Sequence, residues 1–506
     1  MVLRQQEKPL LKTPFNHLDM NKIFAFICFI IVSNQLFAQE NKLTLFDVID
    51  LAKENSIASK AADTRKENRY WQYRSFKANY NPSLNLSGNL PGYNRDYFAN
   101  RLDDGSIIYQ SRKQVSSSLN LGLIQPIAAT GATVSVNSRL NQFGNFASST
   151  LDDEYRSTVL NISLDQPIFG FNDLKWDKLI EPLRYEESKR TYVEEMELIS
   201  QQATMRYFNY LDAQINLQIA KFNLANNETN YKIQEGRYNI GTVSKDQLLQ
   251  VELQLLSSQR AVIQANLDLQ TARLALMSYI GLRQDTDLAI ELVEPEELPV
   301  FQIPVDEALI YAQQNRSDFI QFERRRVEAN RDVAQAKSQR FQTNLSASFG
   351  YNQAGSNLND AYNNPNDEQA VNVSLSMPIL DWGRSRARYE TARANQQLTE
   401  YALDQEGQNF EQEIITLVGR FEVLRANVII SKRSDEVAAE RYNVTQNRYL
   451  IDKSTITDLN IAQTQKDEAK RAYLNSLRQF WDAYFQLRRL TLYDFLNQDL
   501  LYVEEN

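Results

Sequence analysis

The chain contains the same pattern twice, at a fixed spacing. Residues 164–168 (LDQPI) recur as residues 375–379 (LSMPI), and residues 236–241 (GRYNIG) recur as residues 447–452 (NRYLID). Both pairs are 211 positions apart. A constant internal period indicates one supersecondary unit built twice. The sequence therefore predicts two halves of one elongated body, although its 506 residues would by length alone suggest roughly three domains.

The N-terminal region is typical of a secretory leader. A short basic stretch at residues 20–22 precedes an apolar run at 23–32, and small residues before Gln39 offer a cleavage site. We therefore expect a leader at residues 1–38, translated from Met1 or from Met20. The apolar run is too short to span a bilayer. The leader carries four basic and two acidic side chains, so its removal changes the formal charge from −9 to −11.

The composition of the expected mature chain excludes several kinds of chemistry. The only cysteine and the only histidine, Cys28 and His17, both lie in the leader. Transition-metal sites, thiol catalysis and Ser-His-Asp catalysis therefore lack their usual residues. The acidic balance argues against nucleic acid as a partner. A glycosidase would need a pair of carboxylates in a pocket, whereas the acidic residues here follow helix surfaces. We predict no enzyme, no catalytic residue, no cofactor and no metal.

Several segments alternate between aliphatic and small polar residues, as strands with two different faces do. The clearest are residues 83–87, 118–123, 133–137, 160–165 and 371–377. Such alternation is typical of a membrane barrel, which has lipid outside and water inside. An ordinary sheet with one solvated face gives the same pattern. Uncharged polar faces, and aromatic residues such as Tyr93, Tyr109 and Tyr351 flanking the segments, favour the barrel. After Gln39 no run is apolar enough for a transmembrane helix, so a membrane crossing would require a closed barrel.

Long helices separate these strands. Residues 43–80 predict one helix, and residues 172–238 and 384–449 predict two helices that would each reach about 100 Å. Each long helix is followed by another that carries heptad rows, which indicate coiled-coil packing. In the first copy the rows are Leu248, Leu255, Val262, Leu269 and Leu276, beside Val251, Ser258, Ala265, Ala272 and Tyr279. A simple dimeric coiled coil would give the same heptads.

The two halves differ in length between their strands. The first helix restarts at Val305, about 260 positions after its first copy, so the first half carries about 49 extra residues. We expect a first structural repeat at 39–294, which includes an extra hairpin near 89–142 and a linker, and a second repeat at 295–506. The strands of the hairpin, 118–125 and 133–140, could join the barrel and give six strands per chain. They could also fold over as a cap or plug, which would leave four.

The order of these elements resembles the TolC family of outer-membrane efflux channels. The resemblance rests on the turn at residues 237–244 with its second copy at 448–455, on the strand-to-helix segments 166–170 and 377–383, and on the duplication. It covers nearly all of the expected mature chain. It implies an α+β membrane protein built from an internally duplicated helix-strand-strand-helix unit. In this family a trimeric, shared transmembrane β-barrel continues into a long periplasmic α-helical coiled-coil tunnel.

The resemblance also implies a function and partners. It predicts an integral protein of the cell outer membrane that extends into the periplasm and acts as the exit duct of a tripartite efflux or type I secretion system. The expected partners are two further copies of the chain (a homotrimer), a periplasmic adaptor (membrane fusion) protein, an inner-membrane RND or ABC transporter, and outer-membrane lipid. Small molecules or proteins would pass without energy input from the duct. The residues alone leave one alternative open, an exported structural or adhesive coiled-coil protein without channel activity.

The resemblance places control of passage at the helix-turn-helix tips. Asp458 matches a position that forms an acidic ring in family members, whereas Ile461 and Gln247 stand where further gating acids are usual. Our candidate tip gate consists of Asp458, Asp452, Asp246 and Gln247. The alternative is that these carboxylates cap the helices that return from each turn.

The same turns offer candidate contacts for the adaptor. These tip-turn residues are Arg237, Tyr238, Gly241, Ser244, Arg448, Tyr449 and Thr455. They could hold the closed tip, dock the adaptor, or only pack the turn. Gly241 is expected to adopt a left-handed backbone, a position where the second copy has Asp452. Gly281 is expected to end its helix in the same conformation.

Overall fold

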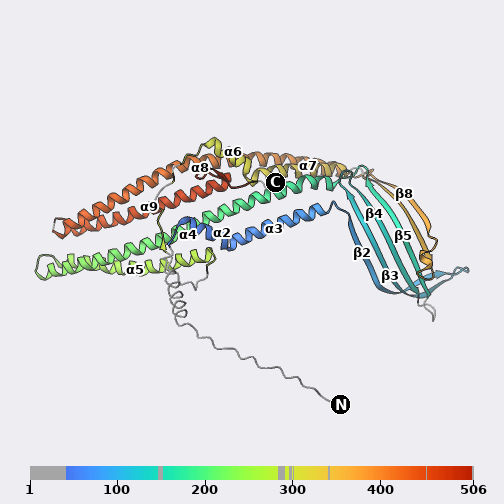
Figure 1. Ribbon diagram of the computed structural model, residues 1–506, viewed down its shortest axis with the longest axis horizontal. Coiled ribbons are helices and arrows are strands. Elements are labelled where there is room, and N and C mark those ends of the chain that lie inside the picture. Colours follow the sequence, from blue (N-terminus) through green and yellow to red (C-terminus); the bar gives the residue numbers. More distant parts are fainter. Residues whose placement is uncertain are drawn as a thin grey trace, which may run out of the picture. The chain divides into compact units, whose positions relative to one another are not determined.

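The computed structural model describes residues 42–145, 152–282, 291–295, 299, 301–339, 342–451 and 453–503. The expected leader, Asp452 and much of the expected linker lie outside the described residues. The chain divides into two compact units. Figure 1 labels helices and strands of both units. Of the described residues, the first unit takes in those up to residue 48 together with those within 209–278 and 282–296. The second unit takes in the described residues within 49–208, 279–281 and 297–506.

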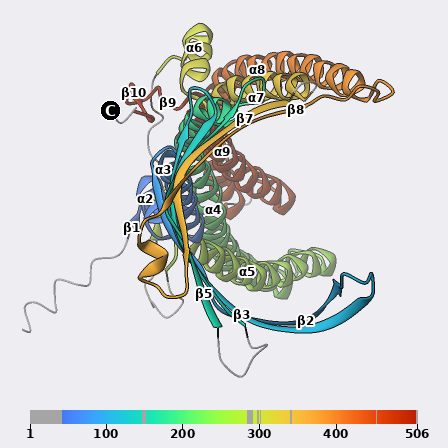
Figure 2. The same cartoon turned by 90° about the vertical axis from the view of Figure 1, so that its right-hand side faces the viewer.

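The second unit contains a six-stranded antiparallel sheet, which curves as a single layer (Figure 2). Its strands are β2 (Ser83–Arg101), β3 (Ile107–Ile127), β4 (Ala132–Asn145), β5 (Asp152–Pro167), β7 (Gln342–Gly355) and β8 (Asn366–Ser376). They lie in the order β2-β3-β4-β5-β7-β8, so β2 and β8 form the two edges. The strands predicted at 118–125 and 133–140 belong to β3 and β4, in the interior of this sheet.

The register of the sheet aligns residues of one kind across the strands. One row consists of Leu84, Leu123, Val136, Ile162 and Phe349. The adjacent row, on the opposite face, consists of Asn85, Gly122, Asn137, Asn161 and Gly350. Because successive side chains in a strand point to opposite faces, the sheet has one aliphatic and one polar face. The aliphatic face is exposed in the single chain, as at Leu86 and Val371, which are each 71% exposed.

The helices begin and end close to where the sequence predicts them, with one exception. The long helices α4 (Asp173–Asn239) and α8 (Arg384–Leu450) each contain 67 residues. The first and last residues of α8 each lie 211 positions after those of α4. The single helix expected at 43–80 is wrong, because the chain forms α2 (Leu45–Asn55) and α3 (Ile57–Ala78). Ser56 has extended backbone and accepts a hydrogen bond from the Ser59 amide at 3.0 Å, so it caps a new helix.

The second copy breaks in the same way. There α6 (Val305–Asn315) and α7 (Ser317–Ser338) are separated by Arg316, which has extended backbone. Glu194 of α4 accepts hydrogen bonds from the backbone amide of Ser317 at 2.8 Å and from its hydroxyl at 2.9 Å. A carboxylate from another helix therefore supplies the acceptor for an otherwise unpaired amide at the start of α7.

In the first unit, the last part of α4 packs against α5 (Lys245–Tyr279). The core there consists of Leu217, Ala220 and Ala265, flanked by Val262 and Leu269. Of the two heptad rows, the one with small residues is the more buried, because short side chains let the two helices approach closely. Two short strands, β1 (Lys42–Leu43) and β6 (Glu291–Leu292), pair in parallel in the same unit.

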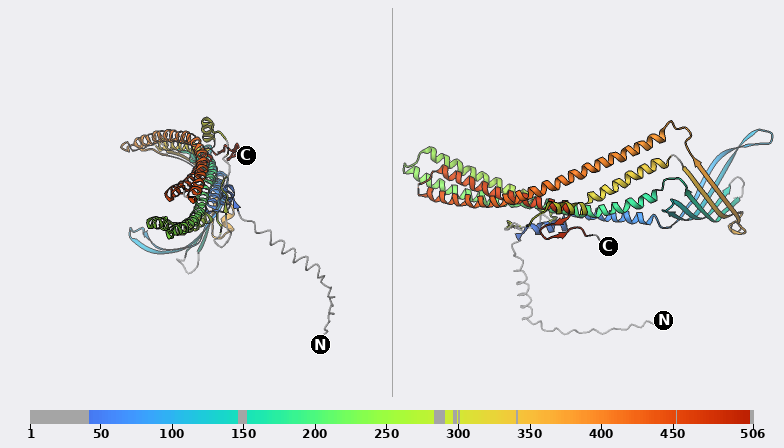
Figure 3. Two further views of the ribbon diagram at one scale, coloured as in Figure 1. Left: turned by 90° about the vertical axis from the view of Figure 1, so that its left-hand side faces the viewer. Right: turned by 90° about the horizontal axis from the view of Figure 1, so that it is seen from above.

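In the second unit, α8 runs beside α9 (Ile456–Thr491) as a long hairpin (Figure 3). Phe421 of α8 and Phe480 of α9 meet with their ring centres 4.9 Å apart, and Trp481 and Tyr484 extend the aromatic cluster. Burial of large aromatic side chains contributes much of the stability of such a pair of helices. Among the helices of the described residues, none is long and apolar enough to cross a bilayer.

Candidate functional site

The first candidate tip is the turn from α4 to α5. The Thr242 amide donates to the Arg237 carbonyl at 3.0 Å, and the Gly241 amide donates to the Tyr238 carbonyl at 2.9 Å. Gly241 has a φ of +79°, the left-handed conformation that the sequence predicts. A Cβ atom on Gly241 would find no heavy atom within 4 Å. The glycine is therefore needed for its backbone conformation and not for space.

A capping box starts the helix that leaves this turn. The Gln247 amide donates to the Ser244 hydroxyl at 3.3 Å, and the Ser244 amide donates to the Gln247 side-chain oxygen at 3.1 Å. This exchange satisfies two backbone donors at the helix start. Asp246 lies in the first turn of α5 and is exposed, where its negative charge interacts favourably with the helix dipole.

The second candidate tip, from α8 to α9, repeats this geometry. The Lys453 amide donates to the Arg448 carbonyl at 2.8 Å. The Asp458 amide donates to the Thr455 hydroxyl at 3.1 Å, and Asp458 Oδ2 accepts from the Thr455 amide at 3.1 Å and from its hydroxyl at 2.7 Å. These hydrogen bonds from Thr455 lower the pKa of Asp458. Asp458 is therefore both an exposed anion and part of a capping box.

The two tips share a backbone frame but present different surfaces. Thr455 and Asp458 lie 211 positions after Ser244 and Gln247, so an acidic capping box replaces a neutral one. Tyr238 is 38% exposed, whereas its counterpart Tyr449 is 2% exposed. Arg448 is exposed and Arg237 is half-buried. The sequence predicted these residues as a group, but the different burial of the two tyrosines depends on packing that the repeat does not reveal.

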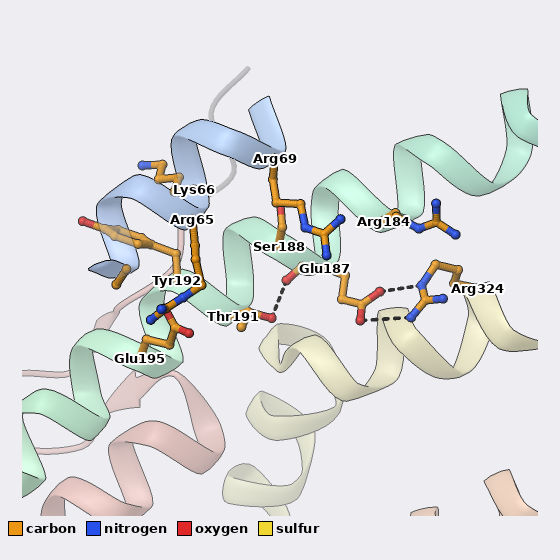
Figure 4. A pocket seen from close by; sticks show the side chains of 11 residues that line it. Arg65, Lys66, Arg69, Arg184, Glu187, Ser188, Thr191, Tyr192, Glu195 and Arg324 are labelled. Carbon is orange, nitrogen blue, oxygen red and sulfur yellow. Dashed lines mark hydrogen bonds and ion pairs between the residues drawn. The ribbon is translucent and has the colours of Figure 1, made fainter. Parts of the chain in front are cut away.

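Sequence reasoning did not find a pocket between α3, α4 and α7 (Figure 4). It has a volume of about 470 Å³. Two ion pairs cross between the helices that line it: Arg324 Nε lies 2.6 Å from Glu187 Oε2, and Arg65 Nη2 lies 3.0 Å from Glu195 Oε2. The signal in the sequence is the run of alternating charges at residues 184–195, spaced to interact on one helix face.

The pocket is best explained as an ion-pair network that joins three helices. Tyr192 donates a hydrogen bond to Asp63 at 2.8 Å, and Lys66 Nζ lies 4.6 Å from the centre of the Tyr192 ring. Burial, together with the hydrogen bond to Asp63, raises the pKa of Tyr192 to about 12, so the phenol stays neutral. Among the described residues, no group of histidine, cysteine or carboxylate side chains could hold a metal ion.

Comparison with known proteins identifies the family of this chain. The profile of the family described as "Outer membrane efflux protein" matches residues 48–282 and 309–491, which is most of the chain. The chain belongs to the outer membrane efflux protein family. Among curated protein sequences, no relative matches it.

Solved structures of outer-membrane channels have the same fold. The VceC outer membrane protein of Vibrio cholerae is 16% identical with a TM-score of 0.62, covering 88% of this chain and 95% of VceC. The CmeC channel of Campylobacter jejuni is 16% identical with a TM-score of 0.64, covering 88% of this chain and 85% of CmeC. The MtrE channel of Neisseria gonorrhoeae is 19% identical with a TM-score of 0.59, covering 88% of each chain.

Family membership establishes the general function of this efflux protein. It is an outer-membrane efflux channel of a tripartite system, it extends into the periplasm, and it is not an enzyme. The resemblance found in the sequence is thereby confirmed, and the alternative of an adhesive coiled-coil protein without channel activity is removed. Long helices and a duplicated unit with antiparallel strands are the architecture that the sequence predicted.

Proposed function

We propose that three copies of this chain form one exit duct, which receives its cargo from a periplasmic adaptor and an inner-membrane RND or ABC transporter. The observation that carries the proposal is the open sheet of the second unit, which ends in edge strands β2 and β8. Unpaired strand edges are a liability that closure into a barrel removes. Pairing of β2 in one copy with β8 in the next would close the wall.

The aliphatic face of this sheet supports outer-membrane lipid as the surrounding medium. Leu84, Leu375 and Val373 are each about two-thirds exposed in the single chain. Apolar side chains on one face and small polar side chains on the other match a wall between lipid and water. A passive duct of this kind needs neither cofactor nor energy source, and the pump would select the cargo, small molecules or proteins.

The duplication supports a corresponding organisation of the chain. We propose that the leader at 1–38 is removed on export, and that residues 39–294 and 295–506 form the two structural repeats. The equal lengths of α4 and α8 and their equivalent tips support this division.

We further propose that the tips gate the duct. Three copies of Asp458 would form an acidic ring at the closed end, with Asp452 and Asp246 adding negative charge and Gln247 occupying the neutral position of the first tip. Exposure of the Asp458 carboxylate at the start of α9 supports this role. The tip-turn residues Arg237, Tyr238 and Arg448 would contact the adaptor.

Single-channel conductance in a planar bilayer tests the gate and separates it from capping. The variants are Asp458→Ala, Asp458→Asn and Thr455→Ala, beside the unsubstituted channel. Asparagine keeps a side-chain oxygen for the capping hydrogen bonds but removes the charge. If Asp458 gates by its charge, both Asp458 variants lengthen openings and reduce the preference for cations, while Thr455→Ala does not.

The opposite pattern would contradict gating by charge. In that case Asp458→Asn behaves like the unsubstituted channel and Thr455→Ala reproduces Asp458→Ala, because only the helix start matters. Gln247→Ala is the matched control, since it removes the neutral capping box of the first tip and changes no charge. Absence of any conductance in the unsubstituted protein would overturn the duct itself.

A further inference from the structure

The inserted hairpin, defined here as β3, β4 and the turn 128–131, occurs in only one of the two repeats. The strands β2 and β5 of the first repeat correspond to β7 and β8 of the second, which follow one another directly in the chain. In the first repeat, β3 and β4 lie between β2 and β5 in both chain order and sheet order. A duplicated wall of four strands has therefore become a wall of six.

The pairing of the inserted hairpin is continuous with the rest of the sheet. β2 pairs with β3 from Ser83↔Ile124 to Arg101↔Ile107, and β4 pairs with β5 from Thr133↔Asp165 to Asn145↔Asp152, each with one irregularity. A cap or plug would instead leave β2 and β5 to pair with each other. The hairpin thus takes up the hydrogen bonds of both neighbouring strands.

Its side chains follow the same two-faced pattern as the rest of the wall. Leu121 and Val136 lie on the aliphatic face, which they share with Leu375 of β8. Asn120 and Asn137 lie on the polar face. A plug inside a water-filled lumen would not need an aliphatic face. The pattern therefore indicates that the hairpin, like the neighbouring strands, has lipid on one face and water on the other.

The helix-side turn of the hairpin is held by the strand-to-helix junctions on either side of it. Asn172 donates to the Ala128 carbonyl at 2.9 Å, and Gln166 donates to the Thr130 carbonyl at 3.0 Å. Gln125 of β3 donates to the carbonyl of Tyr80, in the turn between α3 and β2, at 2.9 Å. Gly131 has a φ of +75°, and a Cβ there would lie 3.1 Å from the Asn172 side chain. The turn is therefore anchored at the base of the wall.

We propose that the inserted hairpin is a permanent part of the channel wall and gives this protein a wider exit pore, suited to bulkier solutes than a wall of four strands per chain would pass. The inference rests on the proposed threefold duct. Three six-stranded sheets would close a barrel of about 18 strands rather than about 12, and diameter grows roughly in proportion to strand number, so the pore would be about 1.5-fold wider.

Spin labels at single cysteines test where the hairpin lies. The expected mature chain has no cysteine and Cys28 lies in the leader, so a Cys28→Ser background carries one label at a time. The labelled variants are Leu121→Cys and Val136→Cys on the aliphatic face, and Asn120→Cys and Asn137→Cys on the polar face. Leu375→Cys and Asn372→Cys in β8 are the matched controls. Each is purified, reconstituted into phosphatidylcholine vesicles, and probed with oxygen, which partitions into lipid, and with a water-soluble nickel chelate.

We expect the labels at residues 121 and 136 to favour oxygen as the label at 375 does, and those at 120 and 137 to favour nickel as the label at 372 does. Nickel access at 121 and 136, while 375 still favours oxygen, would place the hairpin in the lumen and overturn the inference alone. Nickel access at 375 as well would show that the sheet does not face lipid, which would overturn the proposed duct.

Deletion of residues 107–145 provides a second measurement. It removes β3 and β4 and lets β2 pair with β5, as in the second repeat. Polymers of increasing size are added from the extracellular side, and the largest size that still enters the exit pore is measured. This size limit does not depend on the tips. We expect a smaller size limit for polymer entry and a cross-section of the barrel reduced to about half. An unchanged size limit in an assembled deletion variant would contradict a wider pore. If the variant does not assemble, the spin labels decide.

Discussion

Two glycines with the same backbone conformation have different surroundings. Gly241 and Gly281 have φ values of +79° and +72°. A Cβ on Gly241 meets nothing within 4 Å, whereas a Cβ on Gly281 would lie 2.6 Å from the Asn55 carbonyl oxygen. The Leu282 amide also bonds to the Met277 carbonyl at 3.1 Å, which completes a Schellman motif with Gly281 at its left-handed position.

This difference predicts unequal costs for the same substitution. Gly241→Ala adds only the strain of a left-handed alanine, about 1–2 kcal/mol, while Gly281→Ala adds a clash with backbone and costs more. Thermal unfolding of the purified channel measures both. Gly407→Ala, in open space within α8, is the control and should not destabilise. Equal losses for Gly241→Ala and Gly281→Ala would show that the contact with Asn55 does not matter.

At the scale of elements, a buried cluster of charges joins α4, α9 and the segment after α9. Arg488 donates to Glu197 at 3.1 Å and to Asp494 at 2.9 Å, and Tyr484 donates to Asp494 at 2.7 Å. Glu197 and Asp494 are each 2% exposed. Burial raises the pKa of Asp494, but the hydrogen bond from Tyr484 and the charge of Arg488 outweigh it and hold the pKa below its ordinary value.

Removal of the arginine should therefore be costly. Arg488→Met leaves the buried Asp494 without its counterion and leaves Glu197 with Lys53 alone, whose Nζ lies 3.1 Å from Glu197 Oε1. Loss of one partner of a buried ion pair costs about 3–5 kcal/mol. Arg433→Met, which breaks an exposed pair with Glu436, is the matched control and should cost less than about 1 kcal/mol. Chemical denaturation of both variants gives the comparison. A loss for Arg488→Met no larger than that of the control would contradict a structural role for the cluster.

The lowered pKa of Asp494 also gives this cluster a pH dependence. Because the pKa is lower in the folded state than in the unfolded chain, its ionised form stabilises the protein at neutral pH. That contribution is complete above the unfolded value of about 4 and is lost as the pH falls through the folded value. In Arg488→Met, loss of the positive charge should move the pKa of Asp494 upward, so the variant should lose stability at a higher pH than the unsubstituted protein.

At the scale of the whole molecule, assembly decides whether the wall closes. We expect the detergent-extracted protein to have a native mass three times that of the mature chain, and to require detergent because the aliphatic face of the sheet is exposed. Native mass spectrometry, in which the detergent is removed in the gas phase, gives the number of copies in the intact complex. A dimer would close only about 12 strands and would contradict the wider pore as well as the trimer.

Much of the fold is predictable from the sequence because it depends on local periodicity. The long helices, the alternating strands and the two turns all follow from spacing within short windows. The break at Ser56 was missed because apolar residues continue with helical spacing on both sides of it. At the tips, the repeat aligns Gln247 with Asp458. That both residues take part in capping boxes could be seen only from the hydrogen bonds of the folded turns.

The duplication, the types of the elements and the family could all be predicted from the sequence, because order, period and short motifs specify them. Three features became known only from the folded chain: the inserted hairpin lies within the sheet, Tyr449 is buried while Tyr238 is not, and Glu197 contacts Arg488. These features depend on contacts between residues far apart in the chain, such as Glu197 and Arg488, which are 291 positions apart. Strand pairing and charge burial are selected by the free energy of the whole packed unit, and no local pattern specifies their partners.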